Sequence, residues 1–600
     1  MNNMLIDLIA GLSFYILPYL AGRIFVRKVI QAWILGALLW FVIYFVIFGA
    51  NLIVKFDFQN AVRIIAVIIS IVSVINIGRQ FVEQKPKIDW RNVFIASFLA
   101  LFTAFVYFFV WKRNTPYPMQ LNWDIYEHLT LSNLLSLGKL SFSTTQITDT
   151  FTFNSYSPIF NILLSLPKVI FQRGLLGVYW GIEYWHYLLT AFAALILAKK
   201  VFNNNWLALL AAIVSSLVFE SIIVYSTLFL IPQTLVALIT VFVAAEIKEY
   251  KWPILLIAGI VILLMHYVVG VLCLFVLAAL YLSLHINHSK KRINFAIIVS
   301  ALFAFILIVS NLFITWSIPG IEEASHFNFQ LMPKIGFIMD WSGIFLFVFG
   351  SIGVVKIVKE GTYSQKILLC LALIILGIAL APFSYFLKFY VLGHYFWSLI
   401  IAFGIWVFIS NLPSIFKVVG ISFVAFVLLL TFYKNQLVYK EPLNFKNYQT
   451  QISTAEIQAG SWLASQNKDG KAFLVSDPAT QYILEAVSGV NSQGGMYMDL
   501  NTRRILESIN GYYDANTIKN KLSNVKDLVA AKQSGQKTFF VVGGRYFAWQ
   551  RLPISQKDST FYNIWSPKEL TEADKTYVDY YKRVGLKVVF SNKELVIFSL

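Results

Sequence analysis

The sequence contains a succession of apolar segments about 20 residues long, the length that an α-helix needs to cross the hydrocarbon core of a bilayer. Lys, Arg, Asn and Pro residues separate most of these segments. Segment 253–284 is also apolar, but it is too long for one ordinary crossing. This pattern predicts an integral membrane protein built of α-helices. The predicted membrane helices lie at 4–21, 29–53, 61–77, 93–111, 175–198, 206–226, 228–247, 293–317, 341–358, 367–384, 395–410 and 418–433.

The composition agrees with a membrane location. Apolar residues make up 58% of the 600 residues and charged residues 13%, whereas globular proteins average about 45–50% and about 25%. So few charges cannot cover so many apolar side chains in water, which excludes disordered, collagen-like, coiled-coil and disulfide-rich secreted proteins. Both cysteines, Cys273 and Cys370, lie inside apolar segments, so we expect neither a disulfide framework nor a Cys/His metal site.

The net charge of +18 fits a membrane protein better than a nucleic-acid-binding one. Basic residues gather in cytoplasmic loops and near anionic headgroups, and no basic nucleic-acid module is present. With every basic loop placed in the cytoplasm, we expect about fourteen crossings of the plasma membrane and both chain ends outside the cytoplasm. The first apolar segment lacks a preceding basic residue and a cleavage site, which predicts a retained span. The basic clusters are Arg23–Lys28, Arg79–Arg91, Lys199–Lys200, Lys248–Lys251, Lys290–Arg292 and Lys356–Lys366.

This orientation depends on two conditions. Segment 158–172, which contains Pro158 and Pro167, must not cross fully, so it is predicted as a re-entrant or surface-lying helix. Segment 253–284 must cross twice, as two short helices with a turn near His266, because both of its flanks are basic. A single tilted helix is the alternative, and it would break the alternation of sides.

The tail, residues 434–600, is charged, rich in Asn and Gln, and about the size of one domain. Asp477 and Pro478 are typical of the N-cap and the first position of a helix. We predict an α/β domain on the outer face of the membrane. Its predicted strands are 472–476 and 538–542, with a terminal hairpin of 586–590 and 594–598.

The longest predicted outer loop, 112–157, carries Asp124, Glu127 and His128. If a helix begins at Asp124, these side chains fall within about a third of its circumference. A carboxylate held at the lipid–water boundary can act as a general base on an acceptor hydroxyl. The same spacing is a capping box, in which Asp124 simply starts the helix. The two interpretations are compatible, since an N-cap Asp can still face a cleft.

The order of short motifs in this loop resembles the GT-C glycosyltransferases. These are multi-pass enzymes that take a sugar from a polyprenyl-phosphate carrier on the outer face of the membrane. The resemblance covers 93–433, and it implies that Asp124, with Glu127 and His128 beside it, is catalytic or binds a metal. The motifs are Asp124-x-x-x-His128, Gly138-Lys139-Leu140-Ser141 and Phe153-Asn154-Ser155-Tyr156-Ser157-Pro158.

Two features depart from that superfamily's pattern. Three predicted spans precede the resembling region, which the simplest members lack. The oligosaccharyltransferase branch carries Trp-Trp-Asp in its outer domain, whereas the nearest text here is Ile564-Trp-Ser-Pro, without the second Trp or the Asp. This difference argues against transfer to peptide Asn.

Further candidate substrate-binding residues are predicted on the same side of the membrane. His266 lies in an apolar segment, where an ionisable residue indicates function by default; a His hydrogen-bonded between helices is the alternative. Glu322 and Glu323 lie in the predicted loop 318–340. In resembling enzymes such a loop closes over the donor and in some it supplies an acidic residue, whereas merely solvated carboxylates are the alternative here.

Lys388 and His394 belong to an aromatic, basic segment that is predicted as the outer loop 385–394. That combination suits a lipid-linked phosphate, and it equally suits an anchor at the membrane interface. Glu220 and Asp149 are weaker candidates.

We therefore predict a polytopic α-helical, GT-C-like membrane enzyme with N-terminal helices in 1–92, a catalytic module in 93–433 and the outer α/β domain. It would move a sugar from a polyprenyl-phosphate-linked donor to an envelope glycan, lipid or protein, with Asp124 as base and positive residues near 388–394 at the leaving phosphate. Mg²⁺ or Mn²⁺ is compatible with this chemistry, and the sequence leaves the metal open. The alternatives are a transporter or lipid flippase and a non-catalytic envelope assembly protein.

Overall fold

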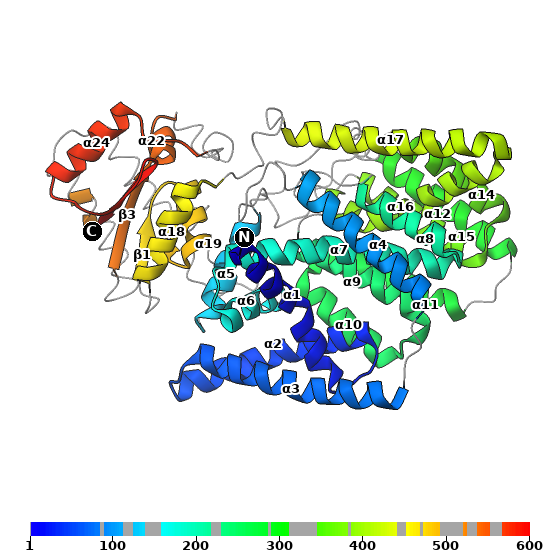
Figure 1. Ribbon diagram of the computed structural model, residues 1–600, viewed down its shortest axis with the longest axis horizontal. Helices are drawn as coiled ribbons and strands as arrows, with labels where there is room; N and C mark the ends of the chain where they lie inside the picture. Colours follow the sequence, from blue (N-terminus) through cyan, green and yellow to red (C-terminus); the bar gives the residue numbers. More distant parts are fainter. Residues whose placement is uncertain are drawn as a thin grey trace.

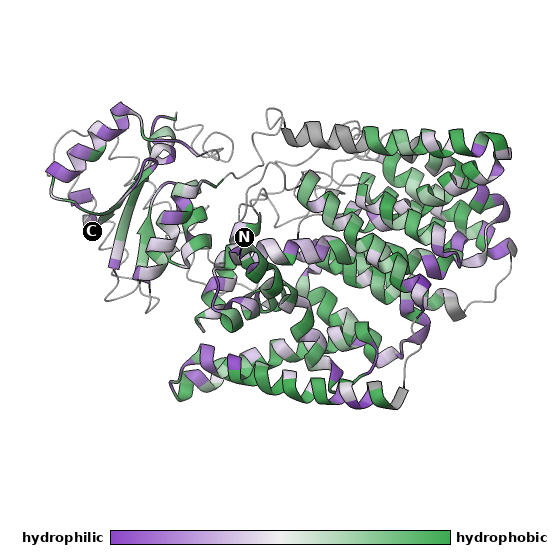
Figure 2. Ribbon diagram, in the orientation of Figure 1, coloured by the Kyte–Doolittle hydropathy of each residue, from purple (hydrophilic) through white to green (hydrophobic). Residues whose placement is uncertain are grey.

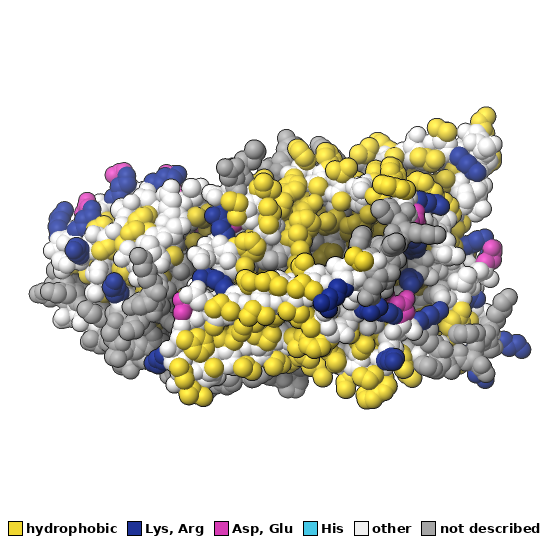
Figure 3. All heavy atoms as spheres, turned by 60° about the horizontal axis from the view of Figure 1, so that its bottom comes forward, with side chains coloured by type: hydrophobic (Ala, Val, Ile, Leu, Met, Phe, Trp, Pro, Cys, Tyr) yellow, Lys and Arg dark blue, Asp and Glu magenta, His cyan; other side chains and the backbone are white. Residues whose placement is uncertain are grey.

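The computed structural model shows a large helical part and a smaller α/β domain at one end of it (Figure 1). Hydrophobic side chains cover much of the face of the helical part that Figure 3 shows, and on this face Lys and Arg gather at the far end and on the α/β domain. The structure describes residues 2–84, 89–111, 124–138, 158–217, 230–285, 290–310, 345–381, 386–440, 452–467, 472–492, 520–521, 523–524, 537–552 and 567–600.

Within the described residues, eight helices are long and apolar enough to cross a membrane. Most residues along them are hydrophobic (Figure 2), and in lipid a helix satisfies its own backbone hydrogen bonds. The chain is therefore a polytopic helical protein, and the figure of about fourteen crossings stays a prediction. The eight are α1 (Asn2–Arg23), α2 (Val29–Ile53), α3 (Phe58–Gln84), α4 (Trp90–Val106) with the π-helix η1 (Tyr107–Trp111), α7 (Leu175–Phe202), α12 (Lys290–Ser310), α15 (Tyr363–Leu380) and α16 (Phe386–Asn411).

Further helices complete the helical part. Segment 158–172 forms one short helix, α6, as predicted, and whether it crosses the bilayer stays a prediction. These further helices are α5 (Asp124–Ser136), α6 (Pro158–Phe171), α8 (Asn205–Leu217), α9 (Pro232–Glu246), η2 (Ile247–Glu249), α10 (Trp252–Met265), α11 (Tyr267–His285), η4 (Phe345–Gly350), α14 (Ser351–Glu360) and α17 (Ser414–Lys440).

Close helix crossings depend on small residues. A Cβ atom on Gly36 of α2 would lie only 1.6 Å from the Pro18 carbonyl oxygen of α1. A Cβ on Gly22 would lie 1.7 Å from the Ala32 carbonyl oxygen in return. The two backbones therefore touch at these glycines, as is common where membrane helices pack without a hydrophobic driving force between them.

Segment 253–284 consists of two helices, which confirms the predicted break and rules out a single tilted helix. Helix α10 ends at Met265, and His266 has an extended backbone with φ −163° and ψ 103°. Helix α11 then folds back and contacts α10. The break therefore lies at the one ionisable residue of an otherwise apolar segment.

The prediction of an outer loop at 385–394 is wrong. Helix α16 already begins at Phe386, so Lys388 and His394 lie inside it. The aromatic and aliphatic residues between them sustain a helix, and Gly393 alone costs only about 1 kcal/mol relative to Ala. The side chains of Lys388 and His394 are both buried, with 6% and 2% of their surface exposed.

The α/β domain has a five-stranded sheet in the order β2-β1-β3-β5-β4. Strand β1 is parallel to β2 and β3, whereas β5 pairs antiparallel with β3 and β4. The predicted strands, the terminal hairpin and the helix start at Asp477 are confirmed, since its carboxylate accepts hydrogen bonds from the next turn. The elements are α18 (Thr454–Gln466), β1 (Ala472–Val475), α19 (Pro478–Ser488), β2 (Asn491–Ser492), β3 (Lys537–Gly543), α22 (Gly544–Gln550), α24 (Glu572–Arg583), β4 (Lys587–Ser591) and β5 (Leu595–Ser599).

Helix α19 of this domain packs against α5 of the helical part. The rings of Tyr126 and Tyr482 meet edge to face with centroids 6.1 Å apart. The Asn133 amide donates a 2.7 Å hydrogen bond to the Ala486 carbonyl oxygen, and its own oxygen accepts from Lys168 of α6 at 2.5 Å. The α/β domain therefore holds one face of α5, while α6 holds another.

Candidate functional site

Helix α5 positions the first group of predicted site residues. Asp124 is its first residue and His128 lies one turn further along. The side chains of Asp124 and Glu127 lie outside the described residues, as do Glu322 and Glu323, so the choice between capping and catalysis stays open at Asp124. The structure does place the helix itself, between the α/β domain and α6.

His128 is almost completely buried, with 2% of its surface exposed. Its Nδ1 lies 3.0 Å from the Asn161 amide oxygen, which can only accept, so Nδ1 carries the hydrogen. Burial lowers the pKa of His128 to about 4, so the ring is neutral at neutral pH. Its Nε2 atom is then a hydrogen-bond acceptor, able to take a proton or to orient a hydroxyl group.

His266 lies within electrostatic range of both Lys388 and His128, although the three come from distant parts of the chain. All three are buried, at 4%, 6% and 2% exposure respectively. The Nδ1 of His266 accepts a 3.2 Å hydrogen bond from the Val269 amide, which fixes the ring at the start of α11. Two buried histidines and one buried ammonium group thus form a candidate site at the α5 end of the helices.

Lys388 is the cationic member of this candidate site, and it is buried. Removing an ammonium group from water is costly unless nearby polar or charged groups compensate for it. Perturbed, buried ionisable groups that gather from several elements are typical of binding or catalytic sites. A cation in this position suits an anionic group such as a phosphate.

His394 lies on a different face of α16 from Lys388. It lies six residues after Lys388, which turns its direction by about 120° at 3.6 residues per turn. Its Nε2 lies 2.8 Å from the Ser215 hydroxyl of α8. The neighbouring Tyr395 hydroxyl lies 3.3 Å from Thr190 of α7. His394 therefore lies in a polar contact between helices, the alternative that sequence analysis raised for His266.

Two further ionisable residues, Glu183 and His186, lie inside the predicted span 175–198 and were not among the predicted site residues. Both belong to α7 and are fully buried. The Tyr107 hydroxyl donates a 2.9 Å hydrogen bond to Glu183, and the Tyr15 hydroxyl lies 3.2 Å from Nδ1 of His186. The sequence could have indicated both residues, because an ionisable residue within a membrane segment indicates function by default.

A metal centre is not visible in the described part of the chain. No group of three or more His, Cys, Asp or Glu side chains gathers there in a way that would hold an ion. The carboxylates that sequence analysis would assign to a metal, on Asp124 and Glu127, have side chains outside the described residues. Mg²⁺ or Mn²⁺ therefore stays a prediction.

No family model matches the chain, and no curated protein matches it in sequence. Among solved structures, the chain is similar to the oligosaccharyltransferase of Archaeoglobus fulgidus. The apo form is 12% identical over 75% of this chain and 69% of that one, with a TM-score of 0.47. Its complex with an inhibitory peptide and a dolichol-phosphate is 12% identical over 75% of this chain and 69% of that one, with a TM-score of 0.44. Its complex with zinc and sulfate is 14% identical over 76% and 69%, with a TM-score of 0.47.

Proposed function

We propose that this protein is a membrane glycosyltransferase of GT-C type that uses a polyprenyl-phosphate-linked sugar donor. The observation that carries the proposal is the gathering of His128, His266 and Lys388 at the α5 end of the helices. Asp124 starts that helix, and the motifs around it carry the sequence resemblance. The acceptor would be a hydroxyl on an envelope glycan, a lipid or a protein.

The proposed reaction is a displacement at the anomeric carbon of the sugar. Asp124 takes the proton of the acceptor hydroxyl as general base. The new bond forms between that oxygen and the anomeric carbon, and the bond from this carbon to the phosphate oxygen breaks. Lys388 stabilises the charge that develops on the leaving polyprenyl phosphate. The neutral rings of His128 and His266 orient the sugar or acceptor by hydrogen bonds.

A divalent cation, if the enzyme uses one, would be held by Asp124 and Glu127 and would neutralise phosphate charge. Glu322 and Glu323 are proposed to face the donor from their loop. None of the steps attributed to Lys388 and His128 depends on the metal.

The outer side of the plasma membrane is the proposed location of the site. Helix α7 begins beside α6 and the outer domain and ends at Lys199 and Lys200 (Figure 1). The α/β domain therefore lies at the end of the helices opposite these lysines. Basic residues favour the cytoplasmic side, which supports an extracytoplasmic position for the domain, α5 and His266.

The test compares two buried lysines. Lys388→Gln removes the ammonium group of the site while keeping most of its shape, and should reduce sugar transfer about 10²-fold or more. Lys366→Gln is the matched control, because Lys366 is equally buried but bonds to Asn294 at 2.7 Å, away from α5. The rates should be compared at equal amounts of folded protein. Equal activity of the two variants would contradict the assignment of Lys388.

A transporter or lipid flippase is the second candidate, favoured by the buried Glu183 and His186 near the middle of α7. Reconstituted vesicles separate the two functions. A glycosyltransferase forms a new glycosidic product on one side of the membrane, whereas a flippase moves the intact lipid-linked sugar between leaflets. A non-catalytic assembly protein would do neither, and would tolerate loss of Asp124.

A further inference from the structure

An apolar groove lies between α1, α2, α7 and α9 of the helical part. It has a volume of about 460 Å³, within the usual range of about 300–1,000 Å³ for ligand sites. Its walls include Trp33, Phe192 and Phe242, and its one charged wall residue is Glu246. The groove therefore combines a hydrocarbon-like interior with a polar end at the last residue of α9.

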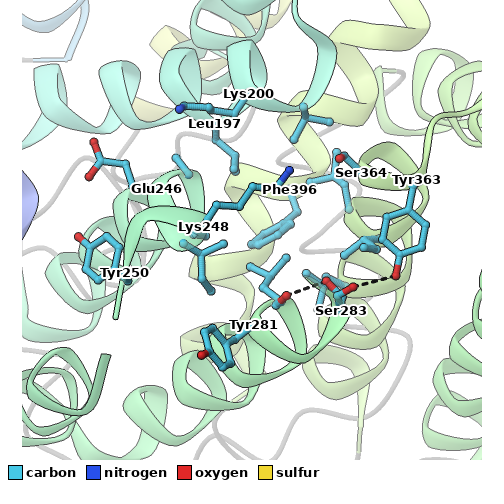
Figure 4. Close-up of a pocket in the computed structure, with 18 of the residues that line it drawn as sticks. Leu197, Lys200, Glu246, Lys248, Tyr250, Tyr281, Ser283, Tyr363, Ser364 and Phe396 are labelled. Carbon is cyan, nitrogen blue, oxygen red and sulfur yellow. Dashed lines mark hydrogen bonds between the residues drawn. The ribbon is translucent and has the colours of Figure 1, made fainter. Parts of the chain in front are cut away.

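A second cavity, of about 700 Å³, begins at the same Glu246. It lies at the basic end of the helices, away from α5, where α7 and α9 end and α15 begins. Figure 4 shows the Lys248 side chain extending into this cavity, with Lys200, Glu246 and Tyr250 around it. One residue thus joins an apolar groove to a polar cavity.

The charged residues at this junction include Lys28, Lys200, Lys248, Glu246 and Glu249. Glu249 accepts from Lys28 at 2.7 Å and lies 3.5 Å from Lys200, so two lysines share it. Lys248 has no ion pair or hydrogen bond within the part of the chain that the structure describes. Lys248 is an exposed residue that lines the cavity, so its ammonium group is open to an anionic ligand there.

Three polar atoms at the same place have no hydrogen-bond partner among the described residues. They are the Trp33 indole nitrogen in the groove, one carboxylate oxygen of Glu246, and the hydroxyl of Tyr250. Tyr250 is only 5% exposed. Buried polar atoms are nearly always hydrogen-bonded in folded proteins. The Trp33 N–H, the Glu246 carboxylate and the Tyr250 hydroxyl are therefore able to bind the polar groups of a ligand.

We propose that this junction binds one glycerophospholipid with an anionic, hydroxyl-bearing headgroup. An acyl chain fills the groove, and its ester carbonyl accepts from the Trp33 indole N–H. The phosphate binds Lys248, and headgroup hydroxyls donate to Glu246 and bond with Tyr250. A polyprenyl phosphate fits less well, because an isoprenoid chain has no ester carbonyl for Trp33. The site is separate from α5 and does not depend on the proposed reaction.

The test is native mass spectrometry of the full-length protein from nanodiscs of phosphatidylcholine with a minor fraction of phosphatidylglycerol. The wild type should retain one phosphatidylglycerol, enriched about tenfold over its share of the bilayer. Trp33→Phe combined with Lys248→Gln should lower this retention about tenfold, a loss expected for charged and neutral hydrogen bonds. The matched control is Trp252→Phe with Lys251→Gln, since Trp252 is 68% exposed and neither residue lines the groove or the cavity.

A second variant guards against misfolding. Tyr250→Phe removes a single hydroxyl and should reduce the preference for phosphatidylglycerol over phosphatidic acid. Equal retention by the wild type and the Trp33/Lys248 variant would overturn the site. Equal retention of phosphatidylcholine would overturn the headgroup assignment, and displacement of phosphatidylglycerol by an added polyprenyl phosphate would assign the site to that lipid instead.

Discussion

Asn133 should control how firmly the outer domain is held on α5. Replacing it with Leu keeps the size of the side chain but removes two contacts, the 2.7 Å hydrogen bond to Ala486 and the 2.5 Å bond from Lys168. An unpartnered buried carbonyl costs about 1–3 kcal/mol, and a lost bond to a charged group about 1.5–3 kcal/mol. Because neighbouring terms are not additive, we expect a loss of about 2–4 kcal/mol in docking free energy.

Hydrogen exchange measures this loss directly. Opening of the α5–α19 contact should become roughly 30- to 1,000-fold more frequent, since about 1.4 kcal/mol corresponds to a factor of ten. Amides of α5 and α19 should therefore exchange faster, while those of the central strands β3 and β5 stay protected. Sugar transfer should fall as well, because α5 carries Asp124.

The matched control is the adjacent Ser132→Ala. Ser132 is fully buried, and its hydroxyl has no hydrogen-bond partner among the described residues. Removing it should leave both exchange and activity unchanged, or stabilise the contact slightly. Unchanged exchange in Asn133→Leu, or an equal effect of both variants, would refute the idea that the outer domain fixes α5 through Asn133.

Three further predictions concern the α/β domain. Burial raises the pKa of Glu485 to about 8, so between roughly pH 4.5 and 8 the folded domain keeps a proton that the unfolded chain has lost. The free energy of unfolding should therefore fall by up to about 1.4 kcal/mol per pH unit in this range, and Glu485→Gln should abolish that slope in thermal melts. Glu456→Gln breaks a buried pair with Arg545 at 2.6 Å and should cost about 3–5 kcal/mol in chemical denaturation, whereas Lys582→Gln at an exposed pair should cost under about 1 kcal/mol. A reporter active only in the cytoplasm should be silent when fused after Leu600.

The sequence was most informative where local chemistry decides the structure. The break at His266 follows from basic flanks around an apolar segment, and the start of α19 follows from the capping chemistry of Asp477 and Pro478. These features need no knowledge of distant contacts. Helix starts, strand alternation and membrane segments are of this kind.

The errors arose where tertiary packing decides. Lys388 suggested a loop because an isolated charge in an aromatic segment resembles an interface anchor, yet it lies buried within α16. The contact between Asn133 and Ala486 joins residues 353 positions apart, so no local pattern predicts it. The hydrogen bond between Glu183 and Tyr107 likewise joins two helices that are distant in the sequence, so the sequence does not predict it. That the candidate residues lie on one side of the membrane stays a prediction.

The central claim is that Asp124 is a catalytic base at the gathering of His128, His266 and Lys388. The most direct measurement is the rate of sugar transfer from a polyprenyl-phosphate-linked donor by Asp124→Asn, with Glu127→Gln alongside it. Asn is nearly as good an N-cap as Asp, so the variant should fold normally, while loss of a general base costs about 10²–10⁴-fold in rate. Glu127→Gln should be milder unless the two residues share a metal. Activity of Asp124→Asn within a few-fold of wild type would contradict the claim, and the base would then have to be sought at Glu322 or Glu323.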